Sequence, residues 1–274
     1  MNTLKRALPI ALSATLSMAG AGSADTIVYS SYAGPKHSVN ERALPPWFED
    51  VTKATNGEID FQLVTGGQLI GARDTAAGVG EGIADMGMVV PSYAPSALPS
   101  IATLYTTLVF GDDVVATGGA VLETLLLDCP SCKAELKRAN VVMFAGYAAT
   151  PFVLMCTKPV TSLDELKGTK VRASGSGVKM MESAGATPVA MNPADGATAM
   201  QRGTIDCVLG SVNWLESYGY QDVAKHVLDF PMGMMGPVMH GYMNRDRWNG
   251  LSDSQKQAMI DAAPMLASRG TLDA

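Results

Sequence analysis

The sequence predicts an α/β fold built as two lobes, each a mixed or parallel sheet flanked by helices. Short apolar runs of β type alternate with helical stretches along the chain, which is the pattern of strands joined by crossover helices. The 274 residues are 47% hydrophobic and 17% charged, which suits one large core or two smaller ones. Two glycine- and proline-containing stretches divide the alternating pattern into separate parts.

The first part of the pattern opens with a strand at 26–31. A helix at 46–55 follows, with prolines at its start and Asn56-Gly57 after its end. The remaining elements expected here are strands at 59–64 and 84–90, a weak helix at 72–80, a loop over 91–100 and a helix over 113–127.

The second part repeats the same logic, ending in an amphipathic helix at 252–268 for which Ser252 is the expected N-cap. The strands expected before it are 141–146, 152–157, 169–173, 188–191, 205–209 and 238–243, and the helices are 177–184, 194–202 and 213–218.

Two stretches, 146–151 and 230–237, have the composition of crossings between lobes. We therefore predict lobe I over 25–146 plus 231–274, and lobe II over 147–230. The alternative is two ordinary loops within one continuous sheet. The chain stops at Ala274 without a helix-stop signal, so we expect lobe I to be truncated at its C-terminal end.

The N-terminus has the pattern of an export signal. Lys5 and Arg6 precede an apolar run over 7–18, and Gly22–Ala24 supplies small residues for cleavage. We expect residues 1–24 to be a signal peptide and the protein to be periplasmic; the alternatives are a membrane anchor or a buried helix. No other run is long enough to be a transmembrane helix.

Charge and motifs exclude several function classes. The formal net charge of −6 argues against nucleic acid as a partner, because binding it needs a basic surface. The sequence contains no nucleophile elbow, phosphate loop, metalloprotease motif or dinucleotide fingerprint, and its three histidines stand in unrelated contexts. We therefore expect no catalytic residues, no metal site and no cofactor.

Four cysteines remain after the signal segment. Cys129 and Cys132 form a CxxC motif, which is compatible with a redox pair, half of a zinc site or a local structural staple. The segment before the motif has a helical pattern and not a strand pattern, so we favour the staple. Cys156 and Cys207 are also free to pair in an oxidising compartment, and the sequence leaves that pairing open.

Arg172 is the strongest candidate for a binding residue. It ends the strand expected at 169–173, and in an α/β lobe the carboxyl end of a strand faces the crevice where ligands bind. Its planar guanidinium is suited to bidentate pairing with a carboxylate. The alternative is a surface arginine that pairs with a nearby aspartate.

The stretch Lys158–Arg172 resembles the hallmark segment of the solute receptors of tripartite ATP-independent periplasmic (TRAP) transporters, the dicarboxylate-receptor (DctP-like) family. The resemblance covers nearly the whole chain after the signal segment, and the order and spacing of the motifs are specific. The other matching motifs are Thr55–Ile59, Gly66–Leu69, Val79–Asp85, Gly185–Pro188 and Met200–Asp206.

The resemblance implies a periplasmic-binding-protein-like fold whose two hinged lobes close on a ligand, with no catalysis. It implies that Arg172 pairs with the carboxylate of a small organic acid or zwitterion, which the receptor delivers to the membrane permease. Further pocket residues are expected after strand ends: Ser31, Tyr32, Gln68, Ser92, Tyr93, Tyr147, Asn213 and Trp214.

Two positions depart from members of the family that bind sialic acid. Phe152 stands where they have a second arginine, and Gly210 stands where they have an asparagine. We therefore expect a less polar pocket, suited to a monocarboxylate, a keto or hydroxy acid, or a zwitterion whose cationic end rests on Trp214. The alternative functions are an exported thiol-disulfide redox protein using Cys129 and Cys132, and a ligand-binding partner of a receptor kinase.

Overall fold

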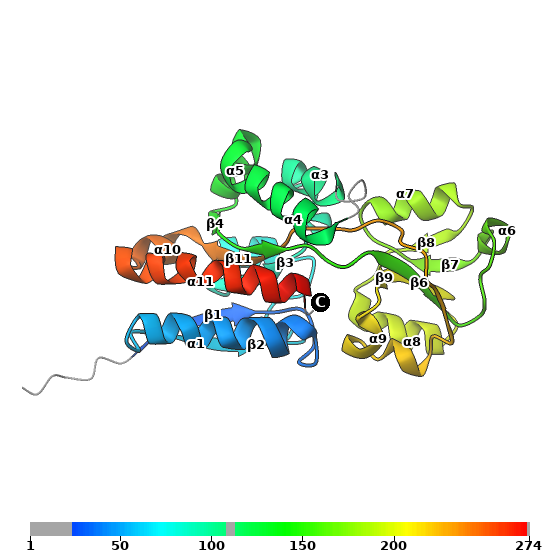
Figure 1. The fold of residues 1–274 in the computed structure, drawn as a ribbon, viewed down its shortest axis with the longest axis horizontal. Helices are drawn as coiled ribbons and strands as arrows, with labels where there is room; N and C mark the ends of the chain where they lie inside the picture. The colour runs from blue at the N-terminus through cyan, green and yellow to red at the C-terminus, as the bar shows by residue number, and fades with distance from the viewer. Residues whose placement is uncertain (1–23, 108–112, 273–274) are drawn as a thin grey trace, which may run out of the picture.

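The computed structural model describes residues 24–107 and 113–272. Figure 1 shows two lobes side by side, joined by extended segments. The predicted signal peptide lies, except for its last residue, outside the described residues.

The sheet of the first lobe has the strand order β2 (Ile59–Val64), β1 (Asp25–Ser30), β3 (Met86–Val89), β11 (Val238–Asn244) and β4 (Val141–Met143). Strands β2, β1 and β3 are parallel. Strand β11 enters from the late part of the chain and lies antiparallel to β3 and β4, and also to the short β5 (Gly146–Tyr147).

The sheet of the second lobe has the order β10 (His226–Leu228), β6 (Phe152–Cys156), β9 (Cys207–Ser211), β7 (Lys170–Arg172) and β8 (Thr187–Val189). Strands β9, β7 and β8 are parallel, while β6 and β10 are antiparallel to their neighbours. The two-lobe α/β fold is confirmed, with both sheets mixed. The lobe boundaries at 146/147 and 230/231 stay a prediction, because strands define the sheets and not the limits of a lobe.

Helices cover both sheets (Figure 1). In the first lobe, α1 (Leu44–Ala54) packs against the long α11 (Asp253–Leu272). The other helices there are α2 (Thr75–Gly80), α3 (Pro99–Thr107), α4 (Val114–Glu123), α5 (Pro130–Arg138) and α10 (Arg245–Gly250). The second lobe contains α6 (Leu163–Leu166), α7 (Ser176–Ser183), α8 (Gly196–Gln201) and α9 (Trp214–Ser217).

Helix α3 overlaps the loop predicted over 91–100 only at the last two residues of that loop, and the rest of the helix was not predicted. The carboxylate of Glu135, in α5, accepts hydrogen bonds from the backbone N–H groups of Ser100 (2.8 Å) and Ile101 (3.2 Å). These are N–H groups of the first turn, which have no partner within their own helix. Because the capping group lies 35 residues away in sequence, the local pattern could not predict this helix start. Helices α5 and α10 and strand β10 were also missed, and all are short.

The predicted cap of α11 is confirmed. Ser252 Oγ accepts a hydrogen bond from the backbone N–H of Gln255 at 3.2 Å, and Gln255 Oε1 accepts one from the backbone N–H of Ser252 at 2.9 Å. This reciprocal pair is a capping box, which satisfies N–H groups at the helix start.

Both cysteine pairs are disulfides. Cys156 and Cys207 are register partners on β6 and β9, so their bond joins two central strands of the second sheet. Cys129 and Cys132 are bonded across the first turn of α5, as expected for a local staple. The segment before Cys129 is a π-helical turn, Thr124–Asp128, and not the strand that precedes a thioredoxin-like motif.

In the described part of the chain, no single helix is long and apolar enough to cross a membrane. One pair bent by 73°, Val114–Asp128 with Pro130–Arg138, meets the criteria of length and composition only when the two are taken together.

Candidate functional site

Arg172 ends β7 and is completely buried at the boundary between the lobes. Its guanidinium donates three hydrogen bonds: Nε to the carbonyl oxygen of Met191 (3.1 Å), Nη1 to that of Leu209 (3.5 Å) and Nη2 to the hydroxyl of Tyr93 (3.0 Å). The first two acceptors belong to the second lobe and the third to the first lobe. The predicted surface ion pair with an aspartate is therefore wrong, because the guanidinium is buried and held by neutral groups.

Among the described residues, no carboxylate forms an ion pair with the charge of Arg172. Burial by itself lowers the pKa of Arg172, but the oxygens of neighbouring tyrosines, Tyr93 first, raise it above its ordinary value. The side chain is therefore a buried cation, and such groups are normally paired with an anion.

Trp214 forms the floor beneath the guanidinium. The carbon Cζ of Arg172 lies 5.2 Å from the centroid of the indole, which is cation–π distance. The indole is in turn packed against Phe152 and Tyr218, with ring centroids 5.5 Å away in each case. Two predicted pocket residues, Trp214 and Phe152, thus lie together with Arg172.

Tyrosines supply the opposite wall from the first lobe. Tyr93, in the 3₁₀ turn Pro91–Tyr93, meets Tyr32 edge to face with ring centroids 5.9 Å apart. Burial, followed by the nearby Tyr93, raises the pKa of Tyr32 well above its ordinary value. Burial raises the pKa of Tyr105 and Tyr147 as well, again with Tyr93 as the next cause. These phenols stay neutral and offer hydroxyl groups as donors and acceptors.

Two predicted polar residues have unused capacity for hydrogen bonds. Ser31 follows β1 and is completely buried, and its Oγ has no hydrogen-bond partner in the described structure. Asn213 donates from Nδ2 to Ser38 Oγ of the first lobe at 3.3 Å, while its buried Oδ1 has no partner. A buried polar atom without a partner is costly, so both atoms are suited to a bound ligand.

The remaining predicted residues are divided. Ser92 lies beside Tyr93 on the cleft, and Gly210 lies on β9 beneath Trp214. Tyr147 stacks on His240 with ring centroids 4.4 Å apart, in the first lobe. Gln68 is exposed in the turn after β2.

The sequence reasoning missed Tyr105 and Tyr218. Tyr105 lies on α3, a helix that was not predicted from the sequence. Tyr218 follows α9 and packs against Trp214 from one side and His37 of the first lobe from the other, with ring centroids 5.5 Å apart in each contact. A tyrosine in isolation carries no signal of such a role, since most buried aromatics are core residues.

A cleft of about 650 Å³ opens between the lobes beside this cluster. Gly175, with φ of 56°, permits the close approach here, because a Cβ on it would lie 3.0 Å from Ser92 Cβ. Arg73 of the first lobe donates to the carbonyl oxygen of Ala190 of the second lobe at 3.5 Å. The lining residues are Ala72, Arg73, Asp74, Ser92, Tyr93, Pro95, Ser174, Gly175, Val178, Ala190, Met191, Asn192 and Asp195.

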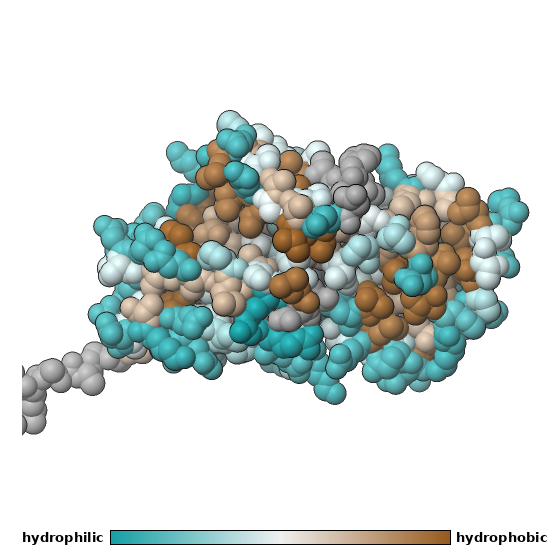
Figure 2. Space-filling model, viewed as in Figure 1, coloured by the Kyte–Doolittle hydropathy of each residue, from teal (hydrophilic) through white to brown (hydrophobic). Residues whose placement is uncertain are grey.

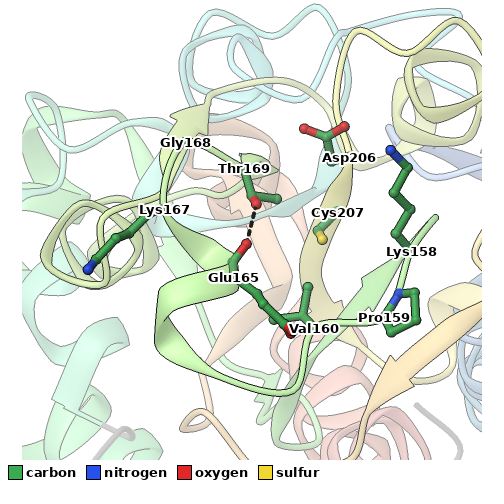
Figure 3. A pocket seen from close by; sticks show the side chains of 9 residues that line it. All are labelled: Lys158, Pro159, Val160, Glu165, Lys167, Gly168, Thr169, Asp206 and Cys207. Carbon is green, nitrogen blue, oxygen red and sulfur yellow. Dashed lines mark hydrogen bonds between the residues drawn. The ribbon is translucent and has the colours of Figure 1, made fainter.

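A second hollow of about 620 Å³ lies within the second lobe (Figure 3). Its acidic groups are already engaged: Glu165 accepts from the hydroxyl and backbone N–H of Thr161, and Asp206 accepts from the backbone N–H of Lys170 at 2.9 Å. In Figure 3 the amine of Lys167 points away from the hollow, and it pairs with Asp164. Arg172 lines neither hollow, but Tyr93 and Met191, which both accept hydrogen bonds from it, line the cleft between the lobes, so we assign the binding site to that cleft.

The surface also carries apolar residues, which gather on the second lobe in Figure 2.

Among the residues that the structure describes, no group of three or more histidine, cysteine, aspartate or glutamate side chains is arranged to hold a metal ion.

The sequence matches a profile of known proteins over residues 29–271, almost the whole described chain. The profile is that of bacterial extracellular solute-binding protein, family 7 (DctP). The chain belongs to this family. The resemblance to TRAP solute receptors predicted from the motifs is thereby confirmed, and the redox alternative is not favoured. Family 7 is a class of solute-binding receptors and not a class of enzymes.

Individual members of the family are distant in sequence and close in fold. The outer membrane transporter protein TsaT of Comamonas testosteroni is 26% identical over 270 residues, which cover 94% of this chain and 76% of TsaT. A TRAP periplasmic solute-binding protein from Desulfovibrio salexigens is 26% identical, with a TM-score of 0.71 over 91% of this chain and 75% of that one.

A marine metagenome TRAP solute-binding protein, solved with 3-hydroxybenzoate, has a TM-score of 0.81 at 22% identity. It aligns with 92% of this chain and 79% of its own. That protein is described as specific for aromatic acid ligands, and at this identity the likeness establishes the fold alone.

Proposed function

We propose that this protein is a periplasmic receptor that captures a small organic acid between its lobes and delivers it to the membrane permease of a TRAP transporter. The observation that carries the proposal is the completely buried Arg172, which forms no ion pair within the described part of the chain and hydrogen-bonds to Tyr93 of the other lobe. Burying a charge without a partner costs roughly several kcal/mol of folding free energy. An anion bound at Arg172 offsets this cost, so the site favours an anionic ligand.

The donors of Arg172 match a carboxylate. A guanidinium has five N–H groups. Three of them donate to Met191, Leu209 and Tyr93, one from each nitrogen. One N–H therefore remains on each terminal nitrogen, and two such donors suit the two oxygens of one carboxylate.

The contacts between the lobes support capture by closure. Two side-chain hydrogen bonds cross from one lobe to the other at the cleft: Arg172 donates to Tyr93, and Asn213 donates to Ser38. A ligand carboxylate on Arg172 adds to the same set of contacts, and it favours the closed arrangement in proportion to its differential affinity for that state.

A panel of paired ligands tests the proposal. The purified protein is titrated calorimetrically with small monocarboxylic acids and, as matched controls, with the methyl esters of the same acids. We expect at least one acid to bind and its ester to bind at least tenfold more weakly. At 100 times its dissociation constant, the acid stabilises the folded protein by about 2.7 kcal/mol, which a melting curve detects.

Equal binding of acid and ester would contradict the role of the carboxylate. Absence of binding across the panel by a protein that melts cooperatively would contradict the receptor function itself.

A further inference from the structure

The indole of Trp214 fills the space that a side chain at position 210 would need. Gly210 lies on β9 and Trp214 begins α9, four positions later. A Cβ placed on Gly210 would lie 2.2 Å from both Cε3 and Cζ3 of the indole, far inside any real contact. No side chain is therefore possible at position 210 while Trp214 holds this position.

The position that Trp214 holds is decided by its partners. One face of the indole packs against the Arg172 guanidinium, whose Cζ lies 5.2 Å from the ring centroid. Phe152 packs against the ring at 59° and Tyr218 at 80°, so the indole is braced by tilted aromatic neighbours on two sides. Such tilted pairs are favourable geometries for aromatic rings, which makes the indole a rigid floor.

The floor beneath Arg172 is the apolar indole of Trp214, which fills the place that a polar side chain at position 210 would need. Among the described residues the buried charged side chains are Arg172 and Glu135, and Glu135 is engaged at the start of α3. Around Arg172 the walls are the rings of Trp214, Phe152 and Tyr93, and its polar partners are two backbone carbonyl oxygens and the hydroxyl of Tyr93. One cation combined with aromatic walls favours a ligand with one carboxylate and an apolar body.

We propose that the Gly210–Trp214 pair is a specificity determinant that selects monocarboxylates with an aromatic body over polyhydroxylated acids. This inference rests on the proposed receptor function. An aromatic body gains ring contacts with the indole and its neighbours. The hydroxyl groups of a sugar acid lose their hydration against the same floor, and each one buried without a partner weakens binding.

The test compares phenylacetate with D-glucuronate, both single carboxylates, and uses acetate as the small control that lacks a body. We expect the wild-type protein to bind phenylacetate at least 100-fold more tightly than D-glucuronate. The double variant Gly210→Asn/Trp214→Ala removes the collision and replaces the apolar floor with an amide. We expect it to lose at least tenfold of that preference, measured as the ratio of the dissociation constants for D-glucuronate and phenylacetate, while the change in affinity for acetate measures the loss common to every carboxylate.

Trp214→Phe is the matched conservative variant, because it keeps a ring without the second ring of the indole. It is expected to retain the preference within about fivefold of wild type. Melting curves of each variant establish that it is folded.

The two proposals fail differently. A wild-type protein that binds acids but shows no preference for phenylacetate, or a double variant that keeps the full preference, would overturn this inference and leave the receptor function standing. Failure of every acid to bind, acetate included, would overturn the receptor function, and this inference with it.

Discussion

Replacing Arg172 by lysine keeps a positive charge in the cleft and removes the planar fork. The guanidinium holds Met191, Leu209 and Tyr93 from three different nitrogens. A lysine ammonium has three N–H groups on a single atom, so it cannot reach these acceptors and also present two donors to a ligand.

The expected loss follows from the number of donors. Arg172→Lys removes at least one of the two charge-assisted hydrogen bonds to the carboxylate, and each is worth about 1.5–3 kcal/mol. The dissociation constant of the acid should therefore rise by roughly 10- to 150-fold. Arg172→Ala removes both donors and the charge, so the dissociation constant should rise by more than about 150-fold.

Isothermal titration calorimetry with the tightest acid of the panel measures these changes. Arg73→Lys is the matched control, since Arg73 lies on the same cleft but is exposed and donates only to the carbonyl oxygen of Ala190. We expect this control to stay within threefold of wild type. An Arg172→Lys protein with an affinity within threefold of wild type, or a control that loses as much affinity, would refute the assignment of the carboxylate to Arg172.

Two further predictions concern stability. Replacing Cys156 and Cys207 by alanine should lower the free energy of unfolding by about 4 kcal/mol, because the two residues are 51 apart in sequence. Replacing Cys129 and Cys132, which are 3 apart, should lower it by only about 1.6 kcal/mol. Urea unfolding measures both, and equal losses would contradict the dependence on loop length. Burial, and next the charge of Arg42, lowers the pKa of His37 to about 4 from its ordinary 6.5. The unfolded state therefore takes up the proton first, so the stability contributed by neutral His37 is fully present above pH 6.5 and is lost as the pH falls to about 4. His37→Gln should flatten the pH dependence of unfolding in that window, and a slope unchanged from wild type would show that His37 is not responsible.

Local patterns in the sequence predicted the elements that local interactions determine. The alternation of strands and helices follows from side-chain periodicity, and the capping box at Ser252 and Gln255 lies within four residues. The position of Arg172 at the end of a strand was also predictable, because the small residues at 173–175 follow it directly. The same position pointed to the crevice, since ligands bind at the carboxyl ends of strands in such folds.

The partners of these residues were decided only by the tertiary structure. The start of α3 depends on Glu135, and the pairing of Cys156 with Cys207 depends on β6 and β9 lying side by side. Tyr105 joined the site because an unpredicted helix carries it there. Gln68 is exposed in the turn after β2, and its place in the site stays a prediction.

The same division applies to the binding site. The sequence by itself determined the receptor family, the strand that carries Arg172, and two departures, at Phe152 and Gly210, that indicate a less polar pocket. Only the tertiary structure decided that Arg172 is buried without an ion-pair partner among the described residues and that Trp214 fills the space left by Gly210. The physical reason is that burial and the sharing of space depend on segments far apart in the chain, whereas periodicity and capping depend on neighbours within one or two turns.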